Sequence, residues 1–217
     1  MALRWRPLSG GCSSPELGTP RCCASNATSG LWRGWQAALV TRAELAGDLQ
    51  QVCSVKGHFA LHSGRTVDRY FDKFMFESDP VLLRAVAELL IPLIPSDTEV
   101  LAGLELGGVP ISTALSMLTG LPQVLVRKET KRYGTAKLVE GLDIAGRRLL
   151  VVEDVITTGG QVVISTQRMR VRRAAISSVL CVVDRRLEPD GPSDELAVAE
   201  ISVLSLFTLA DFAELGV

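Results

Sequence analysis

The chain has 217 residues, of which 47% are hydrophobic and 22% charged, and its formal net charge is −1. This balance excludes a disordered or fibrous protein and gives no electrostatic reason to expect nucleic acid or an anionic membrane as partner. No uninterrupted apolar stretch approaches the roughly 20 residues that a membrane helix needs, so a soluble protein is expected.

Residues 1–36 differ from the rest of the chain. They are rich in Gly, Ser, Pro, Cys and Arg, carry four arginines against one glutamate, and lack helical or strand periodicity. This composition predicts an unstructured extension, or translated sequence upstream of the true start. A transit peptide is the alternative, but no amphipathic helix supports it.

The five cysteines are odd in number and include no Cys-x-x-Cys pair. Neither a disulfide framework nor a zinc site is therefore indicated. Cys181 lies within an apolar run, where a buried small hydrophobic side chain is expected. A reducing compartment, the cytoplasm, fits this pattern best.

From Thr41 the chain shows regular secondary-structure signals. Thr41 and Glu44 form a capping box that opens a helix through about Val55. The segment HFALHSGRTVDRYFDK (58–73) then contains short strand-like pieces interrupted by the turn signal Ser63-Gly64.

Further along, helices alternate with apolar strands. Ser78-Asp79-Pro80 starts a helix with an apolar stripe, which Pro92 and Pro95 end. Strands are expected at 100–104, 123–126, 148–152, 178–183 and 201–206, and helices at 110–118 and 161–171. The four arginines of RMRVRRA, 168–174, are expected to form a solvated face. This alternation predicts one α/β domain, residues 41–217, whose central, mainly parallel sheet is flanked by helices.

The segment LLVVEDVITTGGQVV (149–163) is the most informative for function. A buried-type strand ends in Glu153 and Asp154, and Thr-Thr-Gly-Gly (157–160) leads into a helix. Glycines allow close approach of an anion, and the amides of a helix N-terminus bind phosphate. The two carboxylates would repel a phosphate unless they contact hydroxyl groups or a metal. A sugar phosphate supplies such hydroxyl groups. We therefore expect a sugar-phosphate site at the carboxyl edge of the sheet, with a tight connection and helix-capping acids as the alternative.

A second candidate segment is VRKETKRYGTAKLVEG (126–141). A cationic loop that closes over a site could neutralise a leaving diphosphate. By itself such a run of cations is an exposed surface loop as often as a functional one. Its combination with the phosphate loop favours a role in the active site. Its cations are Arg127, Lys128, Lys131, Arg132 and Lys137.

These segments resemble motifs of the type I phosphoribosyltransferases. Residues 149–163 are similar to that family's phosphoribosyl diphosphate loop, and 126–141 to the mobile catalytic loop of its orotate branch. The resemblance extends, in the family's order, to the orotate-contacting hairpin (FALHSGRTVDRYFDK, 59–73), the diphosphate-contacting turn (GLELGGVP, 103–110) and the orotate-side arginine strand (VVDR, 182–185). It spans about Thr41 to Phe212.

The resemblance implies an orotate phosphoribosyltransferase of pyrimidine (UMP) biosynthesis. This enzyme transfers ribose 5-phosphate from phosphoribosyl diphosphate to orotate, giving orotidine 5′-monophosphate and diphosphate. Also implied are a small N-terminal hood on the sheet and Mg²⁺ on the diphosphate without a direct protein ligand. A homodimer with shared active sites is implied too, in which Lys128 reaches the neighbouring subunit's site.

The resemblance also assigns site residues. The catalytic step would involve Lys131, Glu153 and Asp154. Phosphoribosyl diphosphate would meet Arg127, Lys128, Lys131, Tyr133, Glu153, Asp154, Val155, Ile156, Thr157, Thr158, Gly159, Gly160 and Gln161. Orotate would meet Tyr70, Phe71, Thr157 and Arg185, whose guanidinium can pair with a carboxylate in a bidentate manner. Core packing is the alternative for Tyr70 and Phe71, and a salt bridge to a nearby acid is the alternative for Arg185.

Three positions depart from the family pattern. Many relatives carry histidine in place of Tyr133 and lysine in place of His62, and some carry lysine in place of Gly107. A phenol can still donate a hydrogen bond, so Tyr133 is compatible with activity. Whether His62 and Gly107 contact a substrate stays open.

Three rival functions stay open at this stage. One is transfer to another base, against which Arg185 and the RKETK sequence (127–131) argue. A second is a plain α/β domain that binds some other nucleotide. The third is a non-catalytic regulator that senses phosphoribosyl diphosphate. Residues 1–40 contain no helix-turn-helix pattern, and the cationic loop is intact, so catalysis is favoured.

Overall fold

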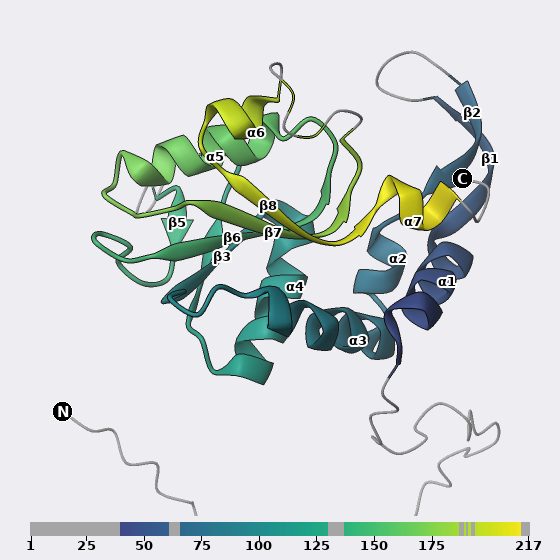
Figure 1. Cartoon of the computed structure of the whole chain (residues 1–217), viewed down its shortest axis with the longest axis horizontal. Coiled ribbons are helices and arrows are strands. Elements are labelled where there is room, and N and C mark those ends of the chain that lie inside the picture. Colours follow the sequence, from purple (N-terminus) through teal and green to yellow (C-terminus); the bar gives the residue numbers. More distant parts are fainter. Residues whose placement is uncertain are drawn as a thin grey trace, which may run out of the picture. The chain divides into compact units, whose positions relative to one another are not determined.

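A six-stranded sheet lies at the centre of the structure, a computed structural model that describes residues 40–60, 66–129, 137–186, 189, 191 and 194–213 (Figure 1). The strand order is β5-β4-β3-β6-β7-β8, and each neighbouring pair is parallel except β4 and β5. The mainly parallel sheet predicted from the sequence is confirmed. In chain order its strands are β3 (Val100–Leu104), β4 (Gln123–Val126), β5 (Val139–Glu140), β6 (Leu149–Ile156), β7 (Ser178–Asp184) and β8 (Ser202–Thr208).

Helices cover both faces of this sheet (Figure 1). One face packs against α3 (Pro80–Leu90) and α4 (Glu105–Thr119), with α1 (Arg42–Cys53) and α2 (Phe74–Glu77) beside them; η1 (Ile91–Leu93) follows α3. The other face packs against α5 (Gly160–Arg170) and α6 (Glu195–Val198). None of the described helices is long and apolar enough to cross a membrane.

Successive strand residues enter two separate hydrophobic clusters. Leu150 and Val152 of β6 pack with the α3–α4 side, whereas Leu149 and Val151 pack with the α5 side. Side chains on a strand alternate between its faces, and here both faces are buried. This explains why the central strands read as continuous apolar runs.

A two-stranded hairpin lies apart from the main sheet, as predicted. β1 (Ser54–Ala60) pairs with β2 (Thr66–Phe71) in antiparallel fashion. The Phe71 ring lies 6.0 Å from that of Phe212 in α7 (Leu209–Ala213). We call residues 54–60 and 66–73 the hood.

Helix starts agree with their capping signals at two places and differ at a third. The Thr41–Glu44 capping box is formed, and Asp79 caps α3 by accepting hydrogen bonds from the amides of the first turn. The predicted start of α4 at Pro110 is wrong, because the helix begins at Glu105. Its first turn contains Gly107 and Gly108, and a Cβ at Gly108 would overlap the Val152 carbonyl oxygen. Close packing on β6 therefore outweighs the low helix propensity of glycine.

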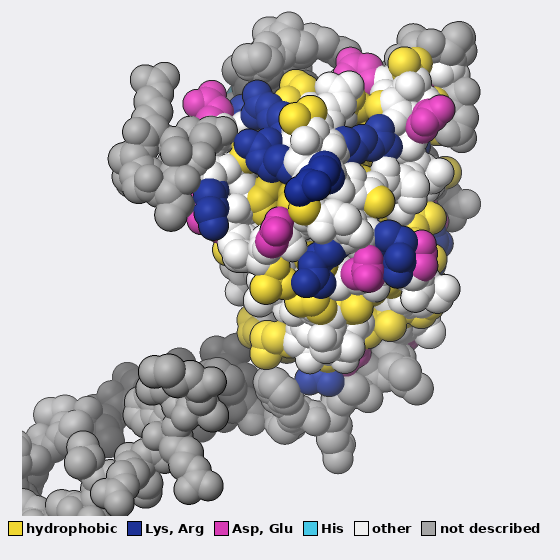
Figure 2. Space-filling model, turned by 90° about the vertical axis from the view of Figure 1, so that its left-hand side faces the viewer, with side chains coloured by type: hydrophobic (Ala, Val, Ile, Leu, Met, Phe, Trp, Pro, Cys, Tyr) yellow, Lys and Arg dark blue, Asp and Glu magenta, His cyan; other side chains and the backbone are white. Residues whose placement is uncertain are grey.

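The arginines at the end of α5 are only partly a solvated face. Arg168, Arg172 and Arg173 are exposed, and Figure 2 shows Lys and Arg side chains gathered on the side of the molecule where α5 ends. Arg170 instead donates hydrogen bonds to the carbonyls of Ile176, Ala199 and Glu200. The expectation that all four are solvated is therefore wrong for Arg170, which joins α5 to the segments before β7 and β8.

Candidate active site

Four segments meet at the carboxyl edge of the sheet. Because β3, β4, β6 and β7 run parallel, the residues that follow them lie at one edge. β4 lies on one side of β3, and β6, the next parallel strand along the chain, lies on the other side of β3. The direction in which strands are added therefore reverses between β3 and β6. Open α/β sheets bind ligands outside such a reversal point.

The phosphate-loop segment has the geometry of an anion site. Thr157 and Thr158 are exposed in a bend between β6 and α5. Gly159 adopts φ +82°, and a Cβ there would lie 2.6 Å from Leu196 Cγ, so both conformation and space require glycine. Gly160 then starts α5, whose first amides and dipole favour an anion.

Other residues of this segment contribute through the backbone or lie along the helix. Val155 and Ile156 complete β6, and the Ile156 carbonyl accepts a hydrogen bond from the Arg185 amide at 2.8 Å. Gln161 Nε2 donates to Ser165 Oγ at 3.1 Å within α5. The backbone bond places Arg185 directly beside the phosphate loop.

Arg185 and Arg186 have different surroundings. The Arg185 side chain is exposed. Arg186 is buried and pairs with Asp184 at 2.7 Å and with Asp194. The structural salt bridge at the end of β7 is therefore formed by Arg186, which leaves Arg185 accessible at the site.

Asp154 is fully buried at the end of β6. Its Oδ2 lies 2.6 Å from Lys73 Nζ, and its Oδ1 accepts a hydrogen bond from the Val155 amide. A Cβ at Gly107, in the first turn of α4, would overlap the same carboxylate. Residues from the hood, α4 and β6 therefore meet at this one side chain.

Two glutamates share this environment with Asp154. Burial, reinforced by the neighbouring Asp154 carboxylate, raises the pKa of Glu77 in α2 and of Glu153 to about 9. Burial alone would lower the pKa of Lys73, but attraction by Asp154, Glu153 and Glu77 outweighs it and the pKa is raised. At neutral pH Glu77 and Glu153 therefore keep their protons, and Lys73 keeps its charge. We call Lys73, Glu77, Glu153 and Asp154 the acid cluster.

The described part of the cationic loop consists of its two ends. The Arg127 amide donates to the Leu138 carbonyl at 2.9 Å, and its guanidinium lies 3.2 Å from Glu140. Lys128 is exposed, and its carbonyl accepts a hydrogen bond from Arg168 of α5. Lys131, Arg132 and Tyr133 lie outside the described residues, as does His62 of the hairpin.

The two aromatic residues assigned to the base differ in exposure. Tyr70 is 45% exposed, with its ring 5.4 Å from that of Phe59. Phe71 is half-buried and packs on Phe212 at the border of the core. Tyr70 is thus accessible on the hood, whereas Phe71 has a packing role; a contact of either with orotate stays a prediction.

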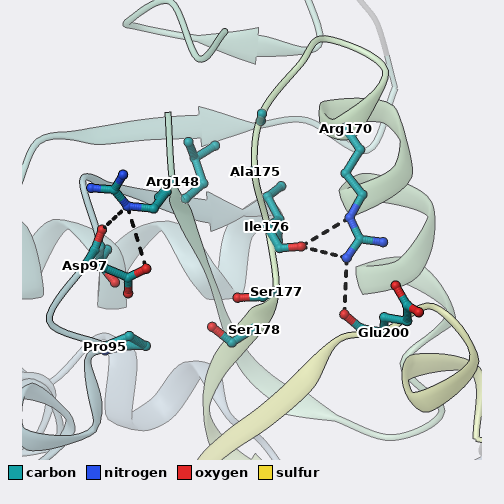
Figure 3. A pocket seen from close by; sticks show the side chains of 12 residues that line it. Pro95, Asp97, Arg148, Arg170, Ala175, Ile176, Ser177, Ser178 and Glu200 are labelled. Atoms are coloured by element: carbon teal, nitrogen blue, oxygen red, sulfur yellow. Dashed lines mark hydrogen bonds and ion pairs between the residues drawn. The ribbon is translucent and has the colours of Figure 1, made fainter. Parts of the chain in front are cut away.

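A hollow of about 560 Å³ lies elsewhere, around the amino ends of β6 and β7 (Figure 3). Its cations already have partners: Arg148 lies on Asp97 and Glu99, and Arg170 donates to backbone carbonyls. Its described lining has no glycine turn like the one at 157–160. We therefore place the candidate site at the phosphate loop.

Two residues of the site, Lys73 and Glu77, were not identified as such from the sequence, and for a third, Gly107, the partner was not identified. Lys73 and Glu77 are far from Asp154 along the chain, and no local pattern links them. Gly107 lies within GLELGG. The glycines of this motif indicate that another group packs closely against the backbone, but they do not show which group it is. Only the fold shows that this partner is Asp154.

Similar proteins identify the family. No protein-family model matches the chain. The orotate phosphoribosyltransferase of Nocardioides sp. is 46% identical over 174 residues, which cover 80% of this chain and 97% of the relative. That of Methanocella arvoryzae is 40% identical over 164 residues, covering 75% and 92%.

A solved structure agrees with these relatives. The orotate phosphoribosyltransferase of Mycobacterium tuberculosis, in complex with Fe(III) dicitrate, matches with a TM-score of 0.69 and 32% identity. The match covers 81% of this chain and 99% of that one. Together with the mainly parallel sheet and its phosphate-loop turn, these matches establish that the chain belongs to the orotate phosphoribosyltransferase family.

Proposed function

We propose that this orotate phosphoribosyltransferase binds both substrates at the carboxyl edge of β3, β4, β6 and β7. There it transfers ribose 5-phosphate from phosphoribosyl diphosphate to orotate, giving orotidine 5′-monophosphate and diphosphate. The observation that carries this assignment is the end of β6, where two acids precede the Thr-Thr-Gly-Gly turn (157–160), with both threonines exposed, at the point of strand reversal. In this arrangement the turn binds the 5-phosphate and the acids accept hydrogen bonds from ribose hydroxyls.

The charges of the reaction assign roles to the remaining residues. Breaking the bond between C1 of the ribose and the diphosphate oxygen builds positive charge on the ring and negative charge on the diphosphate. Arg127, Lys128 and Lys131 would neutralise the diphosphate, while Asp154 would offset the ring charge and Glu153 would accept a hydrogen bond from a ribose hydroxyl. Arg185, beside the loop, would pair with the orotate carboxylate.

Mg²⁺ fits this site as a partner of the substrate. Asp154 is already paired with Lys73, and Glu153 has a raised pKa, so neither offers a free anionic oxygen in the chain alone. The ion would therefore be held by diphosphate oxygens and water, as is usual for Mg²⁺ on phosphates. When bound, it shares the neutralisation of the leaving diphosphate with the loop cations.

We further propose a cytoplasmic homodimer in which Lys128 serves the partner's site. Its exposure at the start of the cationic loop and the family resemblance support this sharing. Cys53 and Cys181 are free and buried, as suits a reducing compartment. Residues 1–36 are proposed to lie outside the phosphoribosyltransferase domain.

The Asp154→Asn variant tests the assigned site. It keeps the shape of the side chain but weakens its capacity to bind ribose hydroxyls and offset ring charge. We expect kcat/KM for phosphoribosyl diphosphate to fall about 10- to 1000-fold, or about 1.4–4 kcal/mol of transition-state stabilisation. Steady-state rates with orotate and Mg²⁺ measure this. Wild-type rates in the variant would show that the carboxylate is structural and the site lies elsewhere.

A further inference from the structure

The turn that ends the hood directs a lysine to the active-site edge. Lys73 lies between β2 and α2, and its Nζ is 2.6 Å from Asp154 Oδ2. The Lys73 side chain is 32% exposed and the Asp154 side chain is fully buried. The hood, which carries Tyr70, is thereby joined through one ion pair to the end of the strand that precedes the phosphate loop.

Gly107 holds the same carboxylate from the other side. Any Cβ at this position would overlap Asp154, so a side chain at position 107 would push the carboxylate out of its contact with Lys73. The position of Asp154 is therefore fixed by two elements distant in sequence. An ionised carboxylate has about four lone-pair sites. The Lys73 ammonium and the Val155 amide each use one of them, and the side chains of Glu77 and Glu153 also hydrogen-bond to this carboxylate.

Two further carboxyl groups lie around Asp154, and their raised pKa values keep both protonated at neutral pH. Glu77 of α2 and Glu153 of β6 act on it directly, and both also interact with Lys73. Asp72 acts on Glu77 from the hood turn, the Cys181 thiol lies near on β7, and α4 presents only a glycine to this side chain. Without the lysine, three carboxyl groups would share one largely buried space.

We propose that Lys73 is a positioning residue for the transfer reaction: its ammonium orients the Asp154 carboxylate and joins the hood to the strand that precedes the phosphate loop. This inference rests on the proposed function. It predicts that loss of the lysine charge affects the chemical step more than the binding of phosphoribosyl diphosphate, since the 5-phosphate is held by the turn at 157–160. The charge of the lysine attracts the carboxylate, and the reach of its side chain sets the orientation of that carboxylate.

The test compares kcat and KM for phosphoribosyl diphosphate in four proteins besides wild type. In Lys73→Met we expect kcat to fall about 10- to 100-fold with KM changed less. Lys73→Arg keeps the charge and should stay within a few-fold of wild type. Lys56→Met removes an exposed lysine of the same hood and should match wild type.

The double variant Lys73→Met/Glu77→Gln separates positioning from folding. Glutamine at position 77 keeps the shape of the glutamate and cannot ionise, so the melting temperature should return toward wild type while kcat stays about 10-fold low. Wild-type kcat in either methionine-containing variant at position 73 would overturn the inference, even if the single variant is poorly folded. Rates are compared with wild type for the same base. A wild type that prefers another base would contradict the proposed function and still leave the effect of Lys73 measurable.

Discussion

At the scale of single residues, two glycines illustrate how position decides the effect of one methyl group. Gly107 and Gly47 both lie in helices, but a Cβ at Gly107 would overlap Asp154 whereas Gly47 has nothing within 4 Å. Their substitution by alanine therefore separates helix propensity from active-site geometry.

We expect Gly107→Ala to lower kcat at least about 10-fold, because the carboxylate must leave its pairing with Lys73. Gly47→Ala should keep wild-type kcat and raise the free energy of unfolding by up to about 1 kcal/mol. Steady-state kinetics and denaturant unfolding measure both. Equal kcat in the two variants would mean that the position of Asp154 is irrelevant to the reaction.

At the scale of elements, the acid cluster joins α2 to β6 and should make stability depend on pH. The pKa of Glu77 and Glu153 is about 9 in the folded chain, against an ordinary value of 4.5. Between these values the folded state binds more protons than the unfolded state, so stability falls as pH rises. We expect the free energy of unfolding to decrease from pH 5 to pH 9, and Glu77→Gln to reduce that slope. A wild-type slope in Glu77→Gln would show that Glu77 titrates normally.

The elements also show what the sequence could and could not predict. β3 and β4 begin and end as predicted, since their apolar runs are bounded by turn residues and both faces of the sheet are covered. The start of α4 was misplaced because Gly107 and Gly108 pack against β6, a contact that no local propensity contains. β5 is only Val139–Glu140 and depends on pairing with β4 at the end of the cationic loop.

The candidate site was predictable to the extent that it is local in sequence. The acids and the Thr-Thr-Gly-Gly turn (157–160) lie in one segment, so chemistry and spacing could be read together. Lys73 and Glu77 come from the hood and α2, and only the packing of these elements against β6 brings them to Asp154. Their pairing with the acids is a property of the fold.

At the scale of the whole molecule, the proposed shared site predicts recovery of activity on mixing. Lys128→Ala and Asp154→Asn, each weak alone, would form heterodimers with one doubly altered site and one intact site. At statistical exchange half of the molecules are heterodimers, so activity should approach about a quarter of wild type. A mixture that stays inactive despite demonstrated subunit exchange would place Lys128 in its own subunit's site.

The choice of base tests the central claim most directly. Diphosphate release is measured with wild-type protein, phosphoribosyl diphosphate and Mg²⁺ while orotate, uracil, adenine and hypoxanthine are supplied in turn. Because Arg185 lies exposed beside the phosphate loop and suits a carboxylate-bearing base, orotate should react with the highest kcat/KM. Faster reaction with any of the three bases that lack a carboxylate would contradict the account.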